Sequence, residues 1–328
     1  MIDFKHRMAA HCENGVISNL LHFHGINLSE AMVFGIGAGI YFTHLPMIKM
    51  NGMAVTSFRP LPGTIFKRVT RSLQIDIQVH KFSRPSKAMD ALDKNLAKGI
   101  PTGMVVGVYH LSYFPAPYRF HFNAHNIVGI GKKEGHYLIS DPVMEDIEQL
   151  SPEELVQVRY ARGTYKPRGK MYYVKSVPEK IDLPGAIKKG IKRTVLEMVR
   201  LPGPVIGING MHYLAKRIEK WPKKGNRYAS RNLGQVIRMQ EEIGTGGAGF
   251  RFLYAAFLQE ASAIMQSELL ASASEQMTQA GDMWREFAVN AARVCKGRNT
   301  SETYSSVANQ LREIAGKEEK IYNSLRKL

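Results

Sequence analysis

The chain has 328 residues and carries 45 Lys and Arg against 28 Asp and Glu, a formal net charge of +17. Hydrophobic residues make up 44% of it, which excludes disorder as the dominant state and suits one large domain or two ordinary ones. Two cysteines in so long a chain exclude a disulfide scaffold and favour a reducing compartment. The sequence shows neither a secretory leader nor an apolar run of membrane-spanning length, so we expect a cytoplasmic protein.

The positive charge is concentrated in one stretch. Residues 159–238 hold 20 basic and 4 acidic side chains, whereas residues 1–158 hold 15 and 13, and residues 239–328 hold 10 and 11. Such a stretch produces a long-range field that attracts anionic partners, which include nucleic acid, anionic membranes and acidic proteins. A solvated surface without a partner is the simpler interpretation of a short charge run, but the strength of this one favours a partner.

The first half alternates helix and strand patterns. Ser151 and Pro152 begin a helix as N-cap and first helical residue, and Asn27 and Glu30 have the spacing of a capping box. The predicted helices are 12–23, 30–34, 86–98 and 151–162, and the predicted strands are 40–45, 53–58, 75–82, 102–109, 123–131, 137–140 and 170–177.

The second half reads as helical throughout. Helical spacing of apolar residues occurs near 184–200, 205–221, 228–243, 249–271, 274–296 and 301–326. We therefore expect an α+β domain over residues 1–178 and a mostly α-helical domain with a basic first segment over residues 179–328.

Three residues in the first domain have the chemistry of a nucleophilic site. Cys12 begins a predicted helix, where free N–H groups and the helix dipole favour a thiolate. His125 starts an apolar strand and Asp141 ends the next one, so an antiparallel hairpin turning at 132–135 would place the two side by side. Taken singly, each residue is better explained as structural: a buried cysteine, a core histidine and a turn aspartate. Together, in this order along the chain, they match papain-like cysteine enzymes.

A resemblance supports this interpretation. The segments 10–14, 19–25 and 28–39 around Cys12, and the segments 124–129 and 137–142 around His125 and Asp141, resemble the N-terminal domain of the butirosin biosynthesis protein H family. The Gly-rich run 244–261 resembles the helical domain that follows in that family. Residues 40–120 and 159–238 add little to the likeness.

The resemblance implies a papain-like fold and acyl transfer in secondary-metabolite biosynthesis, including pathways to aryl polyene pigments. Cys12 would attack the thioester of an acyl carrier protein and become acylated, while His125 acts as base and then acid and Asp141 orients it. Backbone N–H groups at the start of the Cys12 helix would bind the oxyanion, and His6 lies at the spacing of the glutamine that serves papain-type enzymes. No cofactor is expected, since phosphopantetheine arrives on the carrier protein, and no metal, because His11, Cys12, His22 and His24 spread over different helix faces.

Two groups of residues are expected to bind the acidic carrier protein. The first is the basic helix with Lys188, Lys189, Lys192 and Arg193, a pattern that also suits contact with an anionic membrane. The second is the Gly-rich run with Gly246, Gly247 and Arg251, which would hold a phosphate, although it lacks the P-loop lysine and a plain turn explains the glycines equally well.

Other functions stay open at this stage. A thioesterase would use the same triad with water as the acceptor. A cysteine peptidase is less favoured, because no peptide-cleft motif is present. A non-catalytic binder of anionic membrane or nucleic acid would rely on the basic stretch alone, but no base-stacking aromatic motif supports nucleic acid.

Overall fold

The structure is a computed structural model that describes residues 2–50, 52–243, 245–297 and 301–328. No helix in these ranges is both long enough and apolar enough to cross a membrane. The chain folds into two compact units. The first comprises Met1–Val33 with Val69–Ile181, and the second comprises Phe34–Arg68 with Asp182–Leu328. The sequence-based division at residue 178 lies close to the second crossing, but it assigns Phe34–Arg68 to the other unit.

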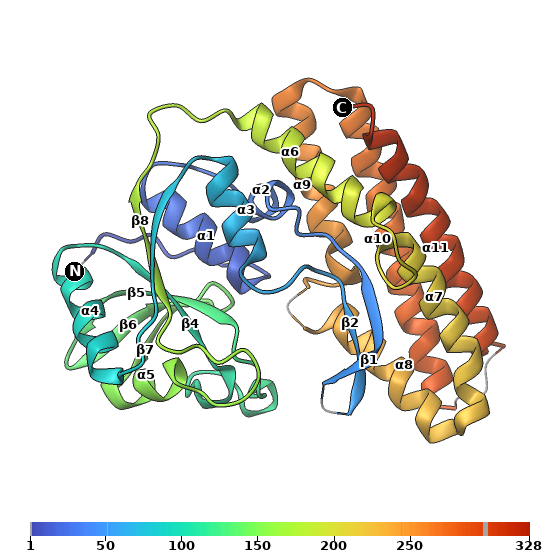
Figure 1. The fold of residues 1–328 in the computed structure, drawn as a ribbon, viewed down its shortest axis with the longest axis horizontal. Coiled ribbons are helices and arrows are strands. Elements are labelled where there is room, and N and C mark those ends of the chain that lie inside the picture. Colours follow the sequence, from blue (N-terminus) through green and yellow to red (C-terminus); the bar gives the residue numbers. More distant parts are fainter. Residues whose placement is uncertain (1, 51, 244, 298–300) are drawn as a thin grey trace. The chain divides into compact units, whose positions relative to one another are not determined.

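The first unit contains a six-stranded sheet in the order β3-β8-β4-β5-β6-β7, in which every neighbouring pair is antiparallel (Figure 1). Its strands are β3 (Asp76–His80), β4 (Thr102–Val106), β5 (His125–Lys133), β6 (His136–Ser140), β7 (Ile147–Leu150) and β8 (Met171–Ser176). The β5–β6 hairpin turns at Glu134 and Gly135, both with positive φ. A side chain at such a position is strained, so glycine suits the turn.

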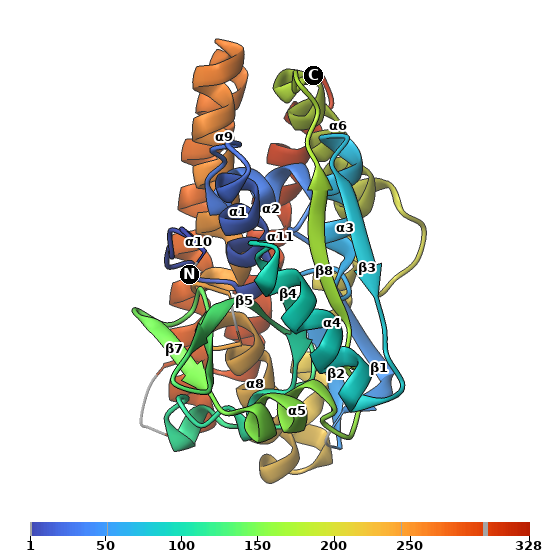
Figure 2. The same ribbon diagram turned by 90° about the vertical axis from the view of Figure 1, so that its left-hand side faces the viewer.

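Helices cover both faces of this sheet (Figure 2). On one face, α4 (Pro85–Ala97) and α5 (Pro152–Arg159) enclose an apolar core whose members include Leu92, Met104, Ile127 and Leu155. On the other, α1 (Cys12–Phe23) contacts β5 and β8. The Ser151 capping box at the start of α5 confirms the expected helix start.

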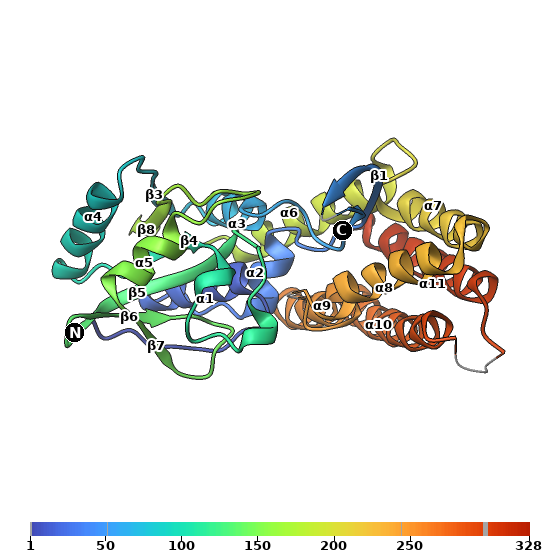
Figure 3. The same cartoon turned by 90° about the horizontal axis from the view of Figure 1, so that it is seen from below.

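The second unit is built mainly from helices. These are α6 (Leu183–Val195), continued by a π-helical turn over Leu196–Arg200, then α7 (Gly207–Lys220), α8 (Asn226–Glu241), α9 (Arg251–Met265), α10 (Glu268–Cys295) and α11 (Tyr304–Leu325). Helix α10 contacts α8, α9 and α11, and α11 also contacts α7, so these helices run beside one another (Figure 3). The Arg251–Glu318 ion pair and the ring of Trp284 lie in their core.

The segment Phe34–Arg68 belongs to this helical unit through specific contacts. Phe34 stacks on Phe250, and a β-carbon on Gly35 would collide with the ring of Phe257. Two strands within the segment, β1 (Thr43–Met50) and β2 (Met53–Ser57), pair only with each other among the named strands of the described chain. They therefore form a separate hairpin, apart from the six-stranded sheet of the first unit.

Short helices at the unit boundaries complete the fold. Helix α2 spans Glu30–Ile36 and α3, which the sequence pattern did not predict, spans Thr64–Ser72. The N-cap of α2 is Ser29, whose hydroxyl accepts from the N–H of Met32, instead of the expected capping box between Asn27 and Glu30. The carboxylate of Glu30 is thereby available for another partner.

Candidate active site

Cys12 is the first residue of α1 and is almost fully buried. The preceding residue, His11, has the extended backbone of an N-cap, and the loop before it is held by Glu30. The carboxylate of Glu30 accepts hydrogen bonds from the N–H groups of Ala10 (2.9 Å) and His11 (2.8 Å). Burial raises the pKa of Glu30, while those two hydrogen bonds and the nearby side chain of Asn14 act in the opposite direction. Glu30 thus fixes the point at which the Cys12 helix begins.

His125 and Asp141 are joined by a 2.7 Å hydrogen bond between Nε2 and Oδ2. This bond confirms the expectation that the hairpin places the two residues side by side. Their positions in the two strands are diagonal, not directly opposite. Ser140 is opposite Val128, so continuing this register would place Asp141 opposite Ile127, and a shift at Gly129–Gly131 interrupts the ladder nearer the turn. The 2.7 Å bond therefore joins His125 to a residue that lies diagonally across the two strands.

Two further groups hold the Asp141 carboxylate. The hydroxyl of Tyr113 donates to Oδ2 over 2.9 Å, and the N–H of Val143 donates to Oδ1 over 3.2 Å. Burial and the negative charge of Asp141 raise the pKa of Tyr113 far above its usual range, so the phenol stays protonated and continues to donate. The ring of Phe114 packs edge-on against the imidazole of His125 at 5.4 Å.

The electrostatics of the site favour a charged imidazole. Burial lowers the pKa of His125, but the negative charges and hydrogen bonds of Asp141 and Cys12 outweigh it and raise the value to about 10. His125 therefore carries a proton at neutral pH. Since Nε2 is bonded to Asp141, Nδ1 is the nitrogen that faces Cys12. A neighbouring imidazolium stabilises a thiolate, which is the nucleophilic form of cysteine.

Gly15 allows α1 to approach the turn that follows Asp141. A β-carbon at Gly15 would lie 2.5 Å from the β-carbon of Pro142 and 2.6 Å from that of Ala9. The N–H of Ala9 also donates to the carbonyl of Pro142 over 2.6 Å. Close contact between the cysteine helix and the Asp-Pro turn thus depends on a missing side chain.

A second pair of polar side chains, Tyr172 and Asn126, lies on the strands near Cys12. The hydroxyl of Tyr172 on β8 donates to Oδ1 of Asn126 over 2.8 Å, and its ring crosses above Gly103, where a β-carbon would come within 2.3 Å of it. Burial and the negative charges of Glu13 and Cys12 raise the pKa of Tyr172. The influence of these two residues shows that the Tyr172 side chain lies close to the start of α1.

His6, considered as an oxyanion donor, is engaged elsewhere. Its Nδ1 is bonded to the hydroxyl of Ser140 (2.8 Å) and its Nε2 to the carbonyl of Met144 (3.1 Å). A carbonyl only accepts, so Nε2 carries the proton and donates it to Met144. This arrangement ties the N-terminal segment to the Asp141 turn and leaves no ring N–H for an oxyanion.

The four basic residues predicted for carrier binding lie in the second unit on α6. Lys188, Lys189, Lys192 and Arg193 are all exposed, while Ile187 and Ile191 are buried beneath them. Arg193 also donates to the carboxylate of Glu197 over 2.7 Å. This helix therefore presents positive charge to solvent.

The Gly-rich run does not form an open phosphate site. The N–H of Ala248 is bonded to the carboxylate of Glu241 (3.2 Å), and the N–H of Gly247 to the hydroxyl of Thr245 (3.1 Å). An acidic side chain of the protein thus occupies the place where a phosphate would bind. Gly246 and Gly247 have positive φ and shape the turn, whereas Gly244 lies outside the described residues.

Arg251 is a core residue, which contradicts its assignment to carrier binding. Its side chain is completely buried and bonded twice to the carboxylate of Glu318, at 2.8 and 2.9 Å, and once to the carbonyl of Gly249. The indole N–H of Trp284 donates to the same carboxylate at 2.6 Å. A buried guanidinium needs such compensation, so this network holds the helical unit together.

Sequence reasoning missed the supporting residues Tyr113, Glu30 and Gly15. Tyr113 lies in an aromatic-rich segment, 109–122, that has neither helical nor strand periodicity. Glu30 had been assigned to a capping box of its own helix. A small residue three positions after a candidate nucleophile was the available signal for Gly15, because close approach of a helix to a neighbouring turn requires one.

Two family models match the chain. The family model described as "Butirosin biosynthesis protein H, N-terminal" matches residues 11–142, and the one described as a domain of unknown function (DUF4872) matches residues 153–325, more than half of the chain. No curated protein matches the chain significantly. A solved structure from Bacillus anthracis, described as a C39-like peptidase, is similar over 54% of this chain and 98% of its own, with 14% identity and a TM-score of 0.37.

Proposed function

Because the chain belongs to the family that joins a butirosin biosynthesis protein H N-terminal domain to the DUF4872 domain, and is a papain-like cysteine enzyme of the α+β class, we propose that it is an acyltransferase. Its substrate is an acyl thioester carried by an acyl carrier protein, and its intermediate is acyl-Cys12. The observation that carries the proposal is the His125 imidazole, bonded to Asp141 on one side and to Cys12 on the other.

The first half-reaction follows from the protonation state of this pair. The Cys12 thiolate attacks the thioester carbonyl, a bond forms between Sγ and the carbonyl carbon, and the bond to the phosphopantetheine sulfur breaks. His125 gives its proton to the leaving thiolate, so the carrier departs as a thiol. Asp141 keeps the imidazole oriented throughout.

The second half-reaction reverses the roles. An acceptor amine or alcohol attacks the acyl carbon, now-neutral His125 takes its proton, and the bond to Sγ breaks to restore the thiolate–imidazolium pair. We assign oxyanion stabilisation to backbone N–H groups of the first turn of α1 from Cys12 onward, because the N–H groups of Ala10 and His11 are bonded to Glu30.

Carrier docking is the second part of the proposal. Acyl carrier proteins are acidic, and the exposed side chains of Lys188, Lys189, Lys192 and Arg193 offer a complementary surface. Reversing these charges should raise KM for the carrier-bound substrate and leave kcat nearly unchanged. An unchanged KM would reject this docking surface.

Two other functions are outcomes of the same test. If water is the acceptor, the protein is a thioesterase with the same triad, and the product is a free acid. If the protein is a non-catalytic binder of membrane or nucleic acid, Cys12→Ala has no effect on its function and no thiol is released.

The experiment follows release of the carrier thiol. Acyl carrier protein loaded with a model acyl group is incubated with wild type, Cys12→Ala and His125→Ala, with and without an amine acceptor. We expect both variants to lose ~10³-fold or more of kcat/KM, and amide to form only with the acceptor present. Equal thiol release by Cys12→Ala and wild type would contradict the enzyme proposal.

A further inference from the structure

The β1–β2 hairpin exposes two large apolar side chains. Leu45 pairs with Val55 and Lys49 pairs with Ala54, so Pro46, Met47 and Ile48 bulge out of the ladder between these pairs. Pro46 has no N–H to donate, which favours such a bulge. Met47 is 93% exposed and Ile48 is 55% exposed, although both are strongly apolar. Side chains of this size in adjacent, exposed positions indicate an interaction surface.

A basic corner lies at the same end of the helical unit. It runs from α7 through the short helix Trp221–Lys224 into α8, and residues 216–231 contain seven basic side chains and one acidic. The acidic residue, Glu219, is paired with Arg312 at 2.8 Å, so it does not offset the lysines. Most of the basic side chains are exposed: Lys216, Lys220, Lys223, Lys224, Arg227 and Arg231.

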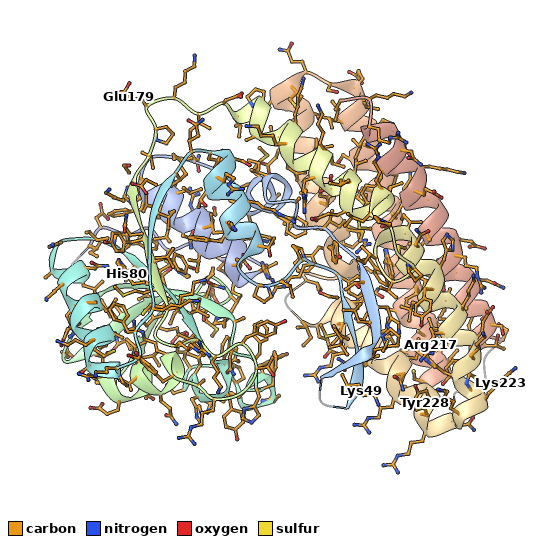
Figure 4. All side chains as sticks on the ribbon, viewed as in Figure 1. Lys49, His80, Glu179, Arg217, Lys223 and Tyr228 are labelled. Atoms are coloured by element: carbon orange, nitrogen blue, oxygen red, sulfur yellow. The ribbon has the colours of Figure 1, made fainter. Side chains whose placement is uncertain are left out.

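Contacts within the unit connect the hairpin to this corner. Strand β1 contacts α7 and β2 contacts α8. The buried ring of Trp221, at the start of the corner, lies 6.4 Å from the ring of His44 on β1. Figure 4 shows Lys49 on the hairpin at the same end as Lys223 and Tyr228.

The chemistry of the two parts is that of a membrane-binding face. The exposed ring of Tyr228 lies 5.4 Å from the ammonium group of Lys224, and amphipathic aromatic side chains of this kind favour the headgroup level of a bilayer. Lysine and arginine side chains attract anionic lipids. Transfer of the exposed side chains of Met47 and Ile48 from water to the boundary between lipid headgroups and acyl chains lowers the free energy of the bound state. Two adjacent apolar side chains bulged into solvent, with a tyrosine and several lysines in the same unit, are the combination expected of an interfacial membrane contact.

We propose that the bulge of Met47 and Ile48, together with the basic corner at 216–231, docks this protein onto an anionic lipid bilayer. The apolar side chains insert at the interface while the lysines and arginines contact lipid phosphates. The protein is then a peripheral membrane protein whose attachment is independent of Cys12 and of the α6 surface. This inference does not rest on the proposed acyl transfer.

The test is co-sedimentation of the full chain with vesicles. Phosphatidylcholine vesicles containing phosphatidylglycerol should retain the protein, and phosphatidylcholine alone should retain much less. Lys223→Glu with Lys224→Glu should lower the partition coefficient at least ~tenfold, because each reversed charge is repelled by the anionic surface that attracted it before. Met47→Ser with Ile48→Ser should weaken binding most at high salt, where charge attraction is screened.

A matched control separates local docking from net charge. Lys87→Glu with Lys94→Glu changes the charge equally on exposed positions of α4 and should leave vesicle binding nearly unchanged. Equal losses in both charge variants, or full binding by Met47→Ser with Ile48→Ser, would overturn the proposal. Binding of acyl carrier protein, instead of vesicles, through Lys223 and Lys224 would also overturn it, because the surface would then serve a protein partner.

Discussion

Gly15 of the cysteine helix and Pro142 of the turn after Asp141 lie so close that no β-carbon fits between them, since one would come 2.5 Å from the β-carbon of Pro142. The position of Cys12 relative to His125 depends on this contact, because it sets how far the start of α1 stands from the strand ends. Shape, as well as chemistry, therefore defines the site.

Gly15→Ala tests this packing. The added methyl forces α1 away from the turn, so we expect a loss of about 1–3 kcal/mol in the free energy of unfolding and a larger fractional loss of activity. Gly316→Ala in α11 is the control, because a β-carbon there meets nothing within 4 Å. That variant should gain about 0.5–1 kcal/mol in the same denaturant titration. Unaltered activity in Gly15→Ala would refute the packing argument.

Asp141→Asn tests whether the negative charge of Asp141 keeps His125 protonated. The pKa of His125 is about 10 because the charges of Asp141 and Cys12 outweigh desolvation. The pKa of His125 is higher in the folded chain than its unfolded value of 6.5, so protonation of His125 stabilises the fold. This stabilisation is complete below pH 6.5 and is lost as the pH rises through the folded pKa of His125. Removing the carboxylate charge should move the alkaline limb of kcat/KM down by ~1–3 pH units. A limb that stays in place would contradict this electrostatic account.

Tyr113→Phe should shift the same limb the other way. The tyrosine hydroxyl donates to the Asp141 oxygen that holds His125, so its removal leaves more negative potential on the imidazolium. We expect the alkaline limb of kcat/KM to move to higher pH. We also expect kcat to fall ~tenfold, because the Asp141 carboxylate loses a hydrogen bond that fixes its orientation, while KM for the carrier-bound substrate stays the same. Tyr118→Phe, on an exposed ring of the same loop, is the control. A change in KM alone would assign Tyr113 to substrate binding instead.

Glu318→Gln tests the buried ion pair of the helical unit. The neutral amide leaves the Arg251 guanidinium buried without a counter-charge, so the unfolding free energy should fall by about 3–5 kcal/mol. Glu319→Gln, its exposed neighbour, should change it by less than about 0.5 kcal/mol. Urea titrations of both variants measure the difference, and equal small effects would show that the pair contributes little.

The candidate site was predictable because it depends on local patterns. A helix start marks Cys12, and a hairpin with an Asp-Pro end brings Asp141 within reach of His125. The diagonal pairing was not predictable, because the register shift at Gly129–Gly131 leaves no trace in the alternation of apolar residues.

Long-range packing accounts for the parts that the sequence did not reveal. Phe34–Arg68 joins the helical unit through contacts with residues far away in the sequence, such as the stacking of Phe34 on Phe250. Arg251 looked like a binding residue because its partner, Glu318, is 67 positions distant. Periodicity identifies a buried face, but it does not identify what covers that face.

The most direct measurement of the central claim is the site of acylation. After a short incubation with acyl-loaded carrier protein, the chain is quenched in acid, digested and mapped by mass spectrometry. Cys295 is an internal control, since burial raises its pKa to about 11 and keeps it a thiol. We expect the acyl group on Cys12 alone, absent in Cys12→Ala and removed by an acceptor amine. An acyl group on Cys295 and not on Cys12, or none on either, would contradict the account.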